Sequence, residues 1–315
     1  MLAPVDSVDV FVLVENYVDM LLGPKPPVAF RVEPTYEALT GEPLHAEHGS
    51  SFLVTVTRDG TRSSILYDAG LGRDTATHNL DVLGTPVGDL RAIVLSHGHT
   101  DHHGGLEGMV RRIGRRSLPL VLHPDAWKDR EIRFPTGAAV HLPPPTRNDL
   151  EREGVELLEE VEPTFLLDGA IMVSGQVERH TDFEPGMPNQ FARTADGGWE
   201  PDPMVWDDQC VVVNVRDRGL VIVSGCSHAG IVNILDHVRT VSGIEHVHGL
   251  VGGLHLTGPV MQPAIAPTVA AIGALRPDVI VPGHCTGFAA TAALASSLPD
   301  SFVMTSIGTR LHFGL

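Results

Sequence analysis

The sequence is poor in cysteine and in basic residues. It has 3 cysteines in 315 residues, so a disulfide framework is excluded, and the odd count suits a reducing compartment. With 22 Lys and Arg against 39 Asp and Glu, the formal net charge is −17. A nucleic-acid binder needs a surplus of cations to neutralise phosphates, so we expect no nucleic-acid partner.

Apolar runs long enough to cross a membrane are also missing. A spanning helix needs about 20 consecutive apolar residues, and Gly, Pro, His or charged residues interrupt every apolar run sooner. Residues 1–20 have no basic start and carry Asp6, Asp9 and Glu15 near their apolar stretch. They are predicted to form a strand rather than a signal peptide. We therefore expect a cytoplasmic protein without a membrane partner.

Motifs of several enzyme classes are absent as well. The sequence has no GxSxG elbow, no P-loop, no GxGxxG after a strand and no pair of CxxC motifs. Its 43% of hydrophobic residues is normal for a globular protein, and the chain is long enough to bury a large core. If this globular chain is an enzyme, its catalytic residues must therefore belong to a motif other than these.

Short apolar runs alternate with amphipathic segments along the chain. Strands are predicted at residues 8–14, 52–56, 64–67, 92–95, 118–122, 210–215, 220–223, 248–251 and 279–281. Helices are predicted at 106–113, from 231 to a stop at Ser242-Gly243, at 266–275 and at 288–297. Such alternation is typical of layered α/β architecture.

Two segments do not fit this alternation. Residues 124–150 and 183–206 are predicted to be loop insertions in a single domain that spans 1–315. The second is rich in Pro and Gly, which argues against a regular element. It also holds Phe191, Trp199 and Trp206, so we predict a lid over a site.

Histidine recurs at the ends of four predicted strands. Each strand runs into a turn of small residues with a histidine, and a helix candidate follows, in AIVLSHGHTDHHGG (92–105), VIVSGCSHAG (221–230), GLVGGLHLTG (249–258) and VIVPGHCTG (279–287). Ligands of open α/β sheets lie beyond the carboxyl ends of the strands. If the four strands lie side by side in parallel, the four turns converge on one site.

The first of these turns has the residues of a metal site. In an extended turn His97 and His99 point to the same side, and Asp101 and His102 can face a second cation beside the first. Imidazole nitrogens and carboxylate oxygens suit zinc, with manganese or iron as alternatives. A lone HxH is a weak signal, but the full six-residue string is specific.

This string is similar to the HxHxDH signature of the metallo-β-lactamase-fold superfamily, and the DAG at 68–70 resembles the acidic motif that precedes it. Other segments resemble the branch typified by dihydropterinyl-methyl-ribofuranosylaminobenzene 5′-phosphate synthase, a methanopterin-pathway enzyme. They include HAEHGSSFLV (45–54), TDFEPG (181–186), SGCSHAGIVNIL (224–235), GGLHLTGP (252–259) and PGHCTGF (282–288). The resemblance covers roughly residues 8–312. It implies a four-layer αββα sandwich with a dinuclear metal site at one edge of the sheets.

The resemblance also implies roles for individual residues. His97 and His99 would bind the first metal ion. Asp101, His102 and His284 would bind the second, and Asp101 is also expected to be catalytic.

The bridging ligand departs from the superfamily pattern. Where many members have Gly-Asp after the strand at 220, this chain has Gly225-Cys226, and residues 207–208 offer aspartates instead of a preceding histidine. Either Cys226 coordinates, or His228 takes over, or hydroxide alone bridges. We predict His228, because imidazole suits the N/O-ligated metals of hydrolases, with Cys226 and Cys285 as small buried neighbours.

Two further residues complete the predicted site. The resemblance implies that Asp68 would orient a ligand imidazole through the free ring N–H. His255 lies at a strand end of the same kind, before a helix candidate capped by Thr257. It is a candidate catalytic residue, and its alternatives are a metal ligand, a substrate contact or a structural histidine.

These features predict a metal-dependent hydrolase of a small phosphorylated or ester-like molecule. Two divalent cations would hold a hydroxide nucleophile at neutral pH. N–H groups at the helix starts after His228 and His255 would stabilise the developing negative charge. Two alternatives remain: a transferase that joins a pterin pyrophosphate to an aminobenzene ribofuranose phosphate, and a metal-binding or ligand-sensing protein without turnover. The sequence leaves the substrate, the metal and the oligomeric state open.

Overall fold

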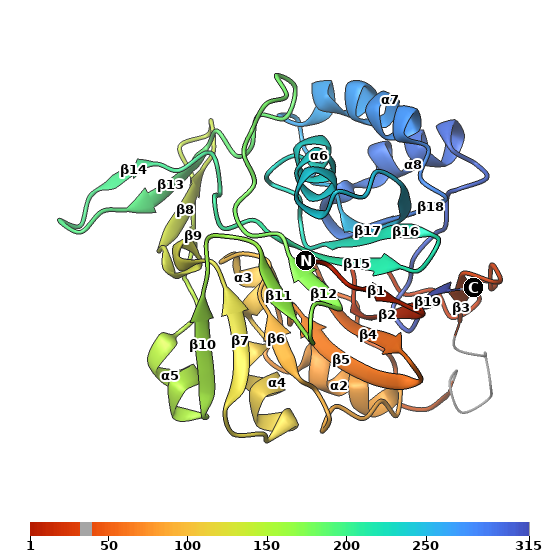
Figure 1. Ribbon diagram of the computed structural model, residues 1–315. Coiled ribbons are helices and arrows are strands. Elements are labelled where there is room, and N and C mark those ends of the chain that lie inside the picture. Colours follow the sequence, from red (N-terminus) through yellow and green to blue (C-terminus); the bar gives the residue numbers. More distant parts are fainter. Residues whose placement is uncertain (32–39, 315) are drawn as a thin grey trace.

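The computed structural model describes residues 1–31 and 40–314 of the chain (Figure 1). In this part of the chain, the strands form a first sheet of seven strands, a second of eight and a third of four. The helices lie on both outer sides of the two large sheets (Figure 1).

The first sheet has the strand order β11-β12-β15-β16-β17-β18, and β1 pairs with β15. β16, β17 and β18 are parallel neighbours, whereas β15 is antiparallel to β16. The strands are β1 (Pro4–Val5), β11 (Thr164–Leu166), β12 (Ile171–Val173), β15 (Cys210–Val215), β16 (Gly219–Ser224), β17 (Val247–Gly253) and β18 (Val279–Gly283).

The second sheet has the order β10-β7-β6-β5-β4-β2-β19-β3. β10, β7, β6 and β5 run parallel, and the other neighbours are antiparallel. The strands are β2 (Ser7–Val14), β3 (Ala29–Phe30), β4 (Ser51–Arg58), β5 (Thr61–Tyr67), β6 (Ala92–Val94), β7 (Leu118–Leu122), β10 (Val155–Glu159) and β19 (Arg310–Gly314).

Three apolar clusters define the layers. A valine-rich cluster with residues from both large sheets lies between them. A second cluster lies between the first sheet and the helices that cover it. A third lies between the second sheet and the helices on its outer face. The first sheet carries α6 (Ile231–Ser242), α7 (Ile265–Leu275) and α8 (Phe288–Ser297), and the second carries α2 (Thr75–Val82), α4 (Leu106–Ile113) and α5 (Arg147–Arg152). The layer order is helix, sheet, sheet, helix, so the predicted αββα sandwich is confirmed.

Local sequence explains these elements well. Strands covered on both faces need continuous apolar runs, as in CVVVNV of β15 and GLVIVS of β16. Helix α4 buries Leu106, Met109, Val110 and Ile113, the stripe expected from helical spacing, and ends at Gly114 with a left-handed φ of 65°. Within residues 1–31 and 40–314, none of the helices combines the length and apolar character that a membrane span requires.

The two segments predicted to be loop insertions build the third sheet. Its strands are β8 (Arg130–Arg133), β9 (Ala139–Leu142), β13 (Gln190–Arg193) and β14 (Trp199–Pro201), in the order β14-β13-β8-β9. The third sheet lies at the left of the view, beside the two large sheets (Figure 1). The prediction that 183–206 lacks regular structure is wrong. β13 pairs on one side with β14, close by in the sequence, and on the other with β8, far earlier in the chain, and local composition does not reveal the second partner.

Candidate metal centre

The histidine-bearing turns meet at one edge of the two large sheets. Three of them follow β16, β17 and β18 in the first sheet, but the turn with His97 follows β6 in the second sheet. The condition that all four strands lie side by side in one sheet is therefore not met. The turns still converge, because the Nε2 atoms of His97 and His228 lie 3.1 Å apart.

A first group of three imidazoles can hold one cation. His97, His99 and His228 are buried, and each offers a ring nitrogen within 4.8 Å of the others. The ring centroids are 4.5 Å apart for His97 and His99, and 4.7 Å apart for either of them and His228. Three converging imidazoles are a donor set that suits zinc.

A second group lies beside the first. It consists of Asp101, His102, Cys226 and His284, whose donor atoms also lie within 4.8 Å of one another. Asp101 Oδ2 is 3.3 Å from His284 Nε2, and Cys226 Sγ is 3.1 Å from His102 Nε2. His284 Nε2 is buried, and its contact with Asp101 is an ion-pair contact rather than a well-formed hydrogen bond among the described residues. Coordination to a cation would satisfy both side chains.

Cys226 and His228 do not compete for one position. His228 belongs to the first group and Cys226 to the second, and a further group joins both of them to His255. Burial raises the pKa of the Cys226 thiol, so the free side chain stays protonated. Binding of a cation would ionise it. Ligation by His228 stays a prediction, and the geometry adds Cys226 as a candidate ligand between the groups.

Burial keeps the first group neutral. It lowers the pKa of His97 and His228 well below the usual value for histidine. Burial and the nearby charge of Arg130 lower the pKa of His99 to about 4. Neutral imidazoles keep the lone pair that a metal ion needs.

The second group has a different charge balance. Burial alone would lower the pKa of His102, but the carboxylates of Asp68 and Asp101 raise it to about 9. Burial would likewise raise the pKa of Asp101, but the neighbouring His102 and His284 hold it well below its usual value. An ionised carboxylate surrounded by imidazoles favours the binding of a cation, and that binding would displace protons from the rings.

Asp68 contacts His102 as the resemblance implied. Its Oδ2 lies 2.6 Å from His102 Nδ1, and its Oδ1 accepts a hydrogen bond from the main-chain N–H of Ser96 at 2.7 Å. Both carboxylate oxygens are therefore used, one to orient the ring and one to hold the start of the ligand turn. With Nδ1 engaged, His102 presents Nε2 to the second group.

We expect Asp68→Asn to weaken zinc binding about 10- to 100-fold, as for other residues that orient metal ligands. An amide has one acceptor oxygen, so either His102 or Ser96 loses its partner. Competition with a chelating dye measures the effect. The control is Asp278→Asn, which changes a carboxylate bonded to His246 and His248 at the other end of β18. Equal losses of affinity in both variants would contradict the assignment.

His284 is held by two residues that sequence reasoning missed. Asn16 Oδ1 lies 3.1 Å from His284 Nδ1, and Glu15 Oε1 accepts from the main-chain N–H of His284 at 2.7 Å. Both residues follow β2, which lies far from His284 in the sequence. The only sequence signal for these two residues was a carboxylate and an amide directly after a buried valine-rich run. The neighbouring sequence does not indicate that their partner is His284.

Left-handed backbone conformations gather around these groups. Asp68, Ser227, His255 and His284 have φ values of 60°, 63°, 43° and 46°. Each costs on the order of 1 kcal/mol for a residue other than glycine, and persists where the surroundings over-determine it. The turns that carry the donors are therefore fixed by their contacts rather than by local preference.

His255 lies next to the first group. Its ring centroid is 4.2 Å from that of His228, and its Nδ1 is buried without a hydrogen-bond partner in the described part of the chain. The expectation that Thr257 caps a helix is wrong. A loop follows, then η2 (Gln262–Ala264), and Ala264 is the residue before α7.

Carboxylates of the chain already accept main-chain N–H groups at the start of α6. Glu184 accepts from the main-chain N–H of Val232 at 2.8 Å, and Asp208 accepts from that of Ala229 at 2.9 Å. The prediction that helix starts after His228 and His255 stabilise developing negative charge is therefore wrong, because carboxylates of the chain occupy the first helix start and no helix directly follows His255.

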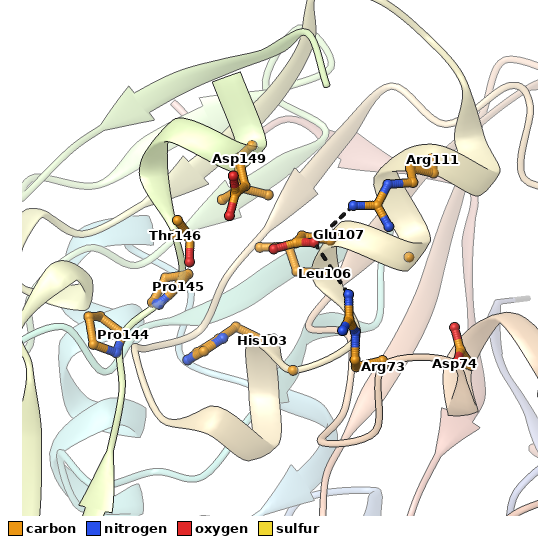
Figure 2. A pocket seen from close by; sticks show the side chains of 13 residues that line it. Arg73, Asp74, His103, Leu106, Glu107, Arg111, Pro144, Pro145, Thr146 and Asp149 are labelled. Carbon is orange, nitrogen blue, oxygen red and sulfur yellow. Dashed lines mark hydrogen bonds and ion pairs between the residues drawn. The ribbon is translucent and has the colours of Figure 1, made fainter. Parts of the chain in front are cut away.

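A separate pocket of about 650 Å³ adjoins α3 (Thr100–His103) and α4 (Figure 2). Figure 2 shows Glu107 between Arg73 and Arg111, with which it forms ion pairs of 3.9 and 2.9 Å. The lining includes His103 but none of the candidate ligands. Both arginines of the lining pair with Glu107, and no candidate ligand is present, so we do not place the reaction there.

The fold is a layered α/β sandwich with two adjacent groups of side chains that could hold metal ions, and the comparison with protein families agrees. The model of the metallo-beta-lactamase superfamily matches residues 46–284. The chain belongs to this superfamily, and the resemblance inferred from its motifs is confirmed.

Among its relatives are two proteins of Methanocaldococcus jannaschii. The chain is 31% identical over 278 residues to 7,8-dihydropterin-6-methyl-4-(beta-D-ribofuranosyl)-aminobenzene-5'-phosphate synthase, covering 86% of this chain and 90% of that one. It is 30% identical over 268 residues to the uncharacterized protein MJ0448, covering 84% and 92%. The structure of Tm1679, a metal-dependent hydrolase of the beta-lactamase superfamily, matches with a TM-score of 0.73 at 22% identity, over 98% of this chain and 100% of that one. At that identity the likeness shows the fold alone.

Proposed function

We propose that this chain is a hydrolase that uses two divalent cations, zinc in the first place, on a small phosphorylated or ester-like substrate. The observation that carries the proposal is the pair of adjacent donor groups, three imidazoles in one and a carboxylate, two imidazoles and a thiol in the other. When bound, such cations supply Lewis acidity and make water a nucleophile at neutral pH.

Two side chains are proposed to act on the substrate. Asp101 lies beside His284 and keeps 20% of its side chain exposed, so a substrate could reach it from solvent. His255 is half-buried beside His228, and its Nδ1 has no partner among residues 1–31 and 40–314. A hydrogen bond from this ring to a substrate oxygen would satisfy it. We assign His255 to substrate contact and proton donation.

The second candidate function is a transferase that joins a pterin pyrophosphate to an aminobenzene ribofuranose phosphate. The similarity to the synthase of Methanocaldococcus jannaschii favours it. The same donor groups would serve this reaction, because loss of pyrophosphate also needs charge neutralisation. Fold and donors are shared by both candidates, so the substrate must be found by assay.

Metal content tests the basis of both candidates. Protein purified without chelator is expected to hold about two equivalents of metal per chain. His99→Ala is expected to hold far less, because the first group loses one of its three imidazoles. His246→Ala, which changes a histidine paired with Asp278, is the control and should match the wild type. A wild type without metal would end the proposal.

Assays then separate the candidates. Phosphodiesters, phosphomonoesters, lactones and thioesters test the hydrolase, and a pterin pyrophosphate with the aminobenzene acceptor tests the transferase through pyrophosphate release. Turnover that His99→Ala abolishes supports an enzyme. A metal-loaded protein without turnover in either assay would favour the ligand-sensing alternative.

A further inference from the structure

Gln190 connects the third sheet to the metal centre. It lies in β13, is fully buried, and places its Oε1 2.6 Å from His99 Nε2. Its Nε2 lies 3.1 Å from the main-chain carbonyl of Asp202 and 3.3 Å from the carboxylate oxygen Oδ2 of that residue. A fully buried amide with every polar end engaged has one orientation available.

The partners of Gln190 determine which end of the amide faces His99. Both contacts on the Asp202 side are acceptors, so the NH₂ group must lie there. The carbonyl oxygen then faces His99, and an acceptor at 2.6 Å requires a proton on the ring Nε2. The lone pair of His99 is therefore on Nδ1.

Asp202 is the first residue of a hydrogen-bond network that leads back to the turn that carries His97 and His99. Asp202 Oδ2 accepts from Arg130 Nε at 2.8 Å, and Arg130 binds both oxygens of Asp207 at 2.6 and 3.0 Å. Asp207 Oδ2 also accepts from the main-chain N–H of Gly98 at 2.7 Å. The charged side chains of this network are buried. The network thus holds one residue of the turn by its ring and the preceding residue by its main chain.

We propose that Gln190 is a positioning residue that fixes His99 in the Nε2–H tautomer, so that Nδ1 is the nitrogen offered to a cation. The inference rests on the proposed metal site. It gives the third sheet a role in that site, because β13 supplies the group that sets the ring of a ligand from another part of the fold. A histidine free to exchange tautomers would present the wrong nitrogen part of the time and bind more weakly.

The tautomer of His99 is measurable without metal. Histidine-selective ¹⁵N labelling of the metal-free wild type, with His99→Asn protein to assign the signal, is expected to show a protonated Nε2 and an unprotonated Nδ1. In Gln190→Leu the ring is expected to populate both tautomers, and zinc affinity should fall about 10- to 100-fold. A wild-type ring protonated on Nδ1 would overturn the inference.

The matched control is Gln209→Leu. Gln209 is also buried, and its Nε2 donates to the main-chain carbonyl of Leu95 at 2.9 Å, outside the network. This variant loses a buried amide of the same kind, so its His99 signal and zinc affinity should match the wild type. Equal losses of zinc affinity in both variants would show a general packing effect and overturn the role of Gln190. The tautomer in metal-free protein is independent of metal content, so this inference and the proposed function can fail separately.

Discussion

Arg130→Met is expected to lower the free energy of unfolding by about 3–5 kcal/mol, the usual cost of breaking a buried ion pair by removing one partner. The guanidinium is fully buried and is bound to the carboxylates of Asp202 and Asp207. Burial alone would lower the pKa of Arg130, but these carboxylates raise it, so the group stays charged. In the variant, the two buried carboxylates lose the guanidinium that neutralises them. Urea denaturation followed by circular dichroism measures the loss.

The control for this variant is Arg193→Met in β13. Arg193 is 53% exposed and lies 3.6 Å from Asp129, so its removal should cost at most about 1 kcal/mol.

The effect of Arg130 on stability also depends on pH. Burial would raise the pKa of Asp207, but Arg130 lowers it from 3.8 to about 2. The lowered pKa gives stability above pH 3.8 that is lost as the pH falls toward 2, so the two proteins should converge there. Equal stabilities of Arg130→Met and wild type at neutral pH would contradict this account.

Gly104→Ala is expected to destabilise the fold by about 3 kcal/mol, through overpacking of a site that cannot relax. Gly104 has helical angles, φ −56° and ψ −34°, so alanine meets no conformational penalty there. The obstacle is space. A Cβ would overlap the main-chain oxygen of Leu71 and lie 2.6 Å from its carbonyl carbon. Main chain on both sides must move, and the moving helix carries Asp101 and His102. Thermal unfolding measures the effect.

Gly273→Ala is the matched control. Gly273 is inside α7, and the nearest atom to an added Cβ is Leu298 Cδ2 at 3.7 Å, an ordinary contact. Alanine is the better helix former by about 1 kcal/mol, so this variant should be more stable than the wild type. A loss of stability in Gly273→Ala would show that glycine-to-alanine changes are costly in this fold for reasons other than space.

Several regular elements of the two large sheets and their helices could be predicted from the sequence because their signals are local. The spacing of apolar residues in α4 and the valine-rich runs of β15 and β16 match the observed bounds closely. Sheet membership could not be predicted this way. β6 and β16 present the same pattern, an apolar run before a histidine turn, yet they lie in different sheets.

The candidate site divides along the same line. The motif residues His97, His99, Asp101 and His102 can be recognised from their spacing within one turn. The residues that hold their side chains in place cannot be recognised from the sequence. Gln190 lies 91 residues from His99 in the sequence, inside a segment whose prolines and glycines favoured a loop. Contacts over such separations depend on the whole topology, and composition carries no trace of them.

The hydrogen bonds of His284 have a consequence for the order in which the site is assembled. Asn16 and His284 are separated by 268 residues, and β19 pairs with β2 beside them. During synthesis, the ribosome releases every donor of the first group well before it releases His284. All three imidazoles of the first group are therefore synthesised before His284 can join the second group. The last position of the candidate site is completed only after most of the polypeptide has been made.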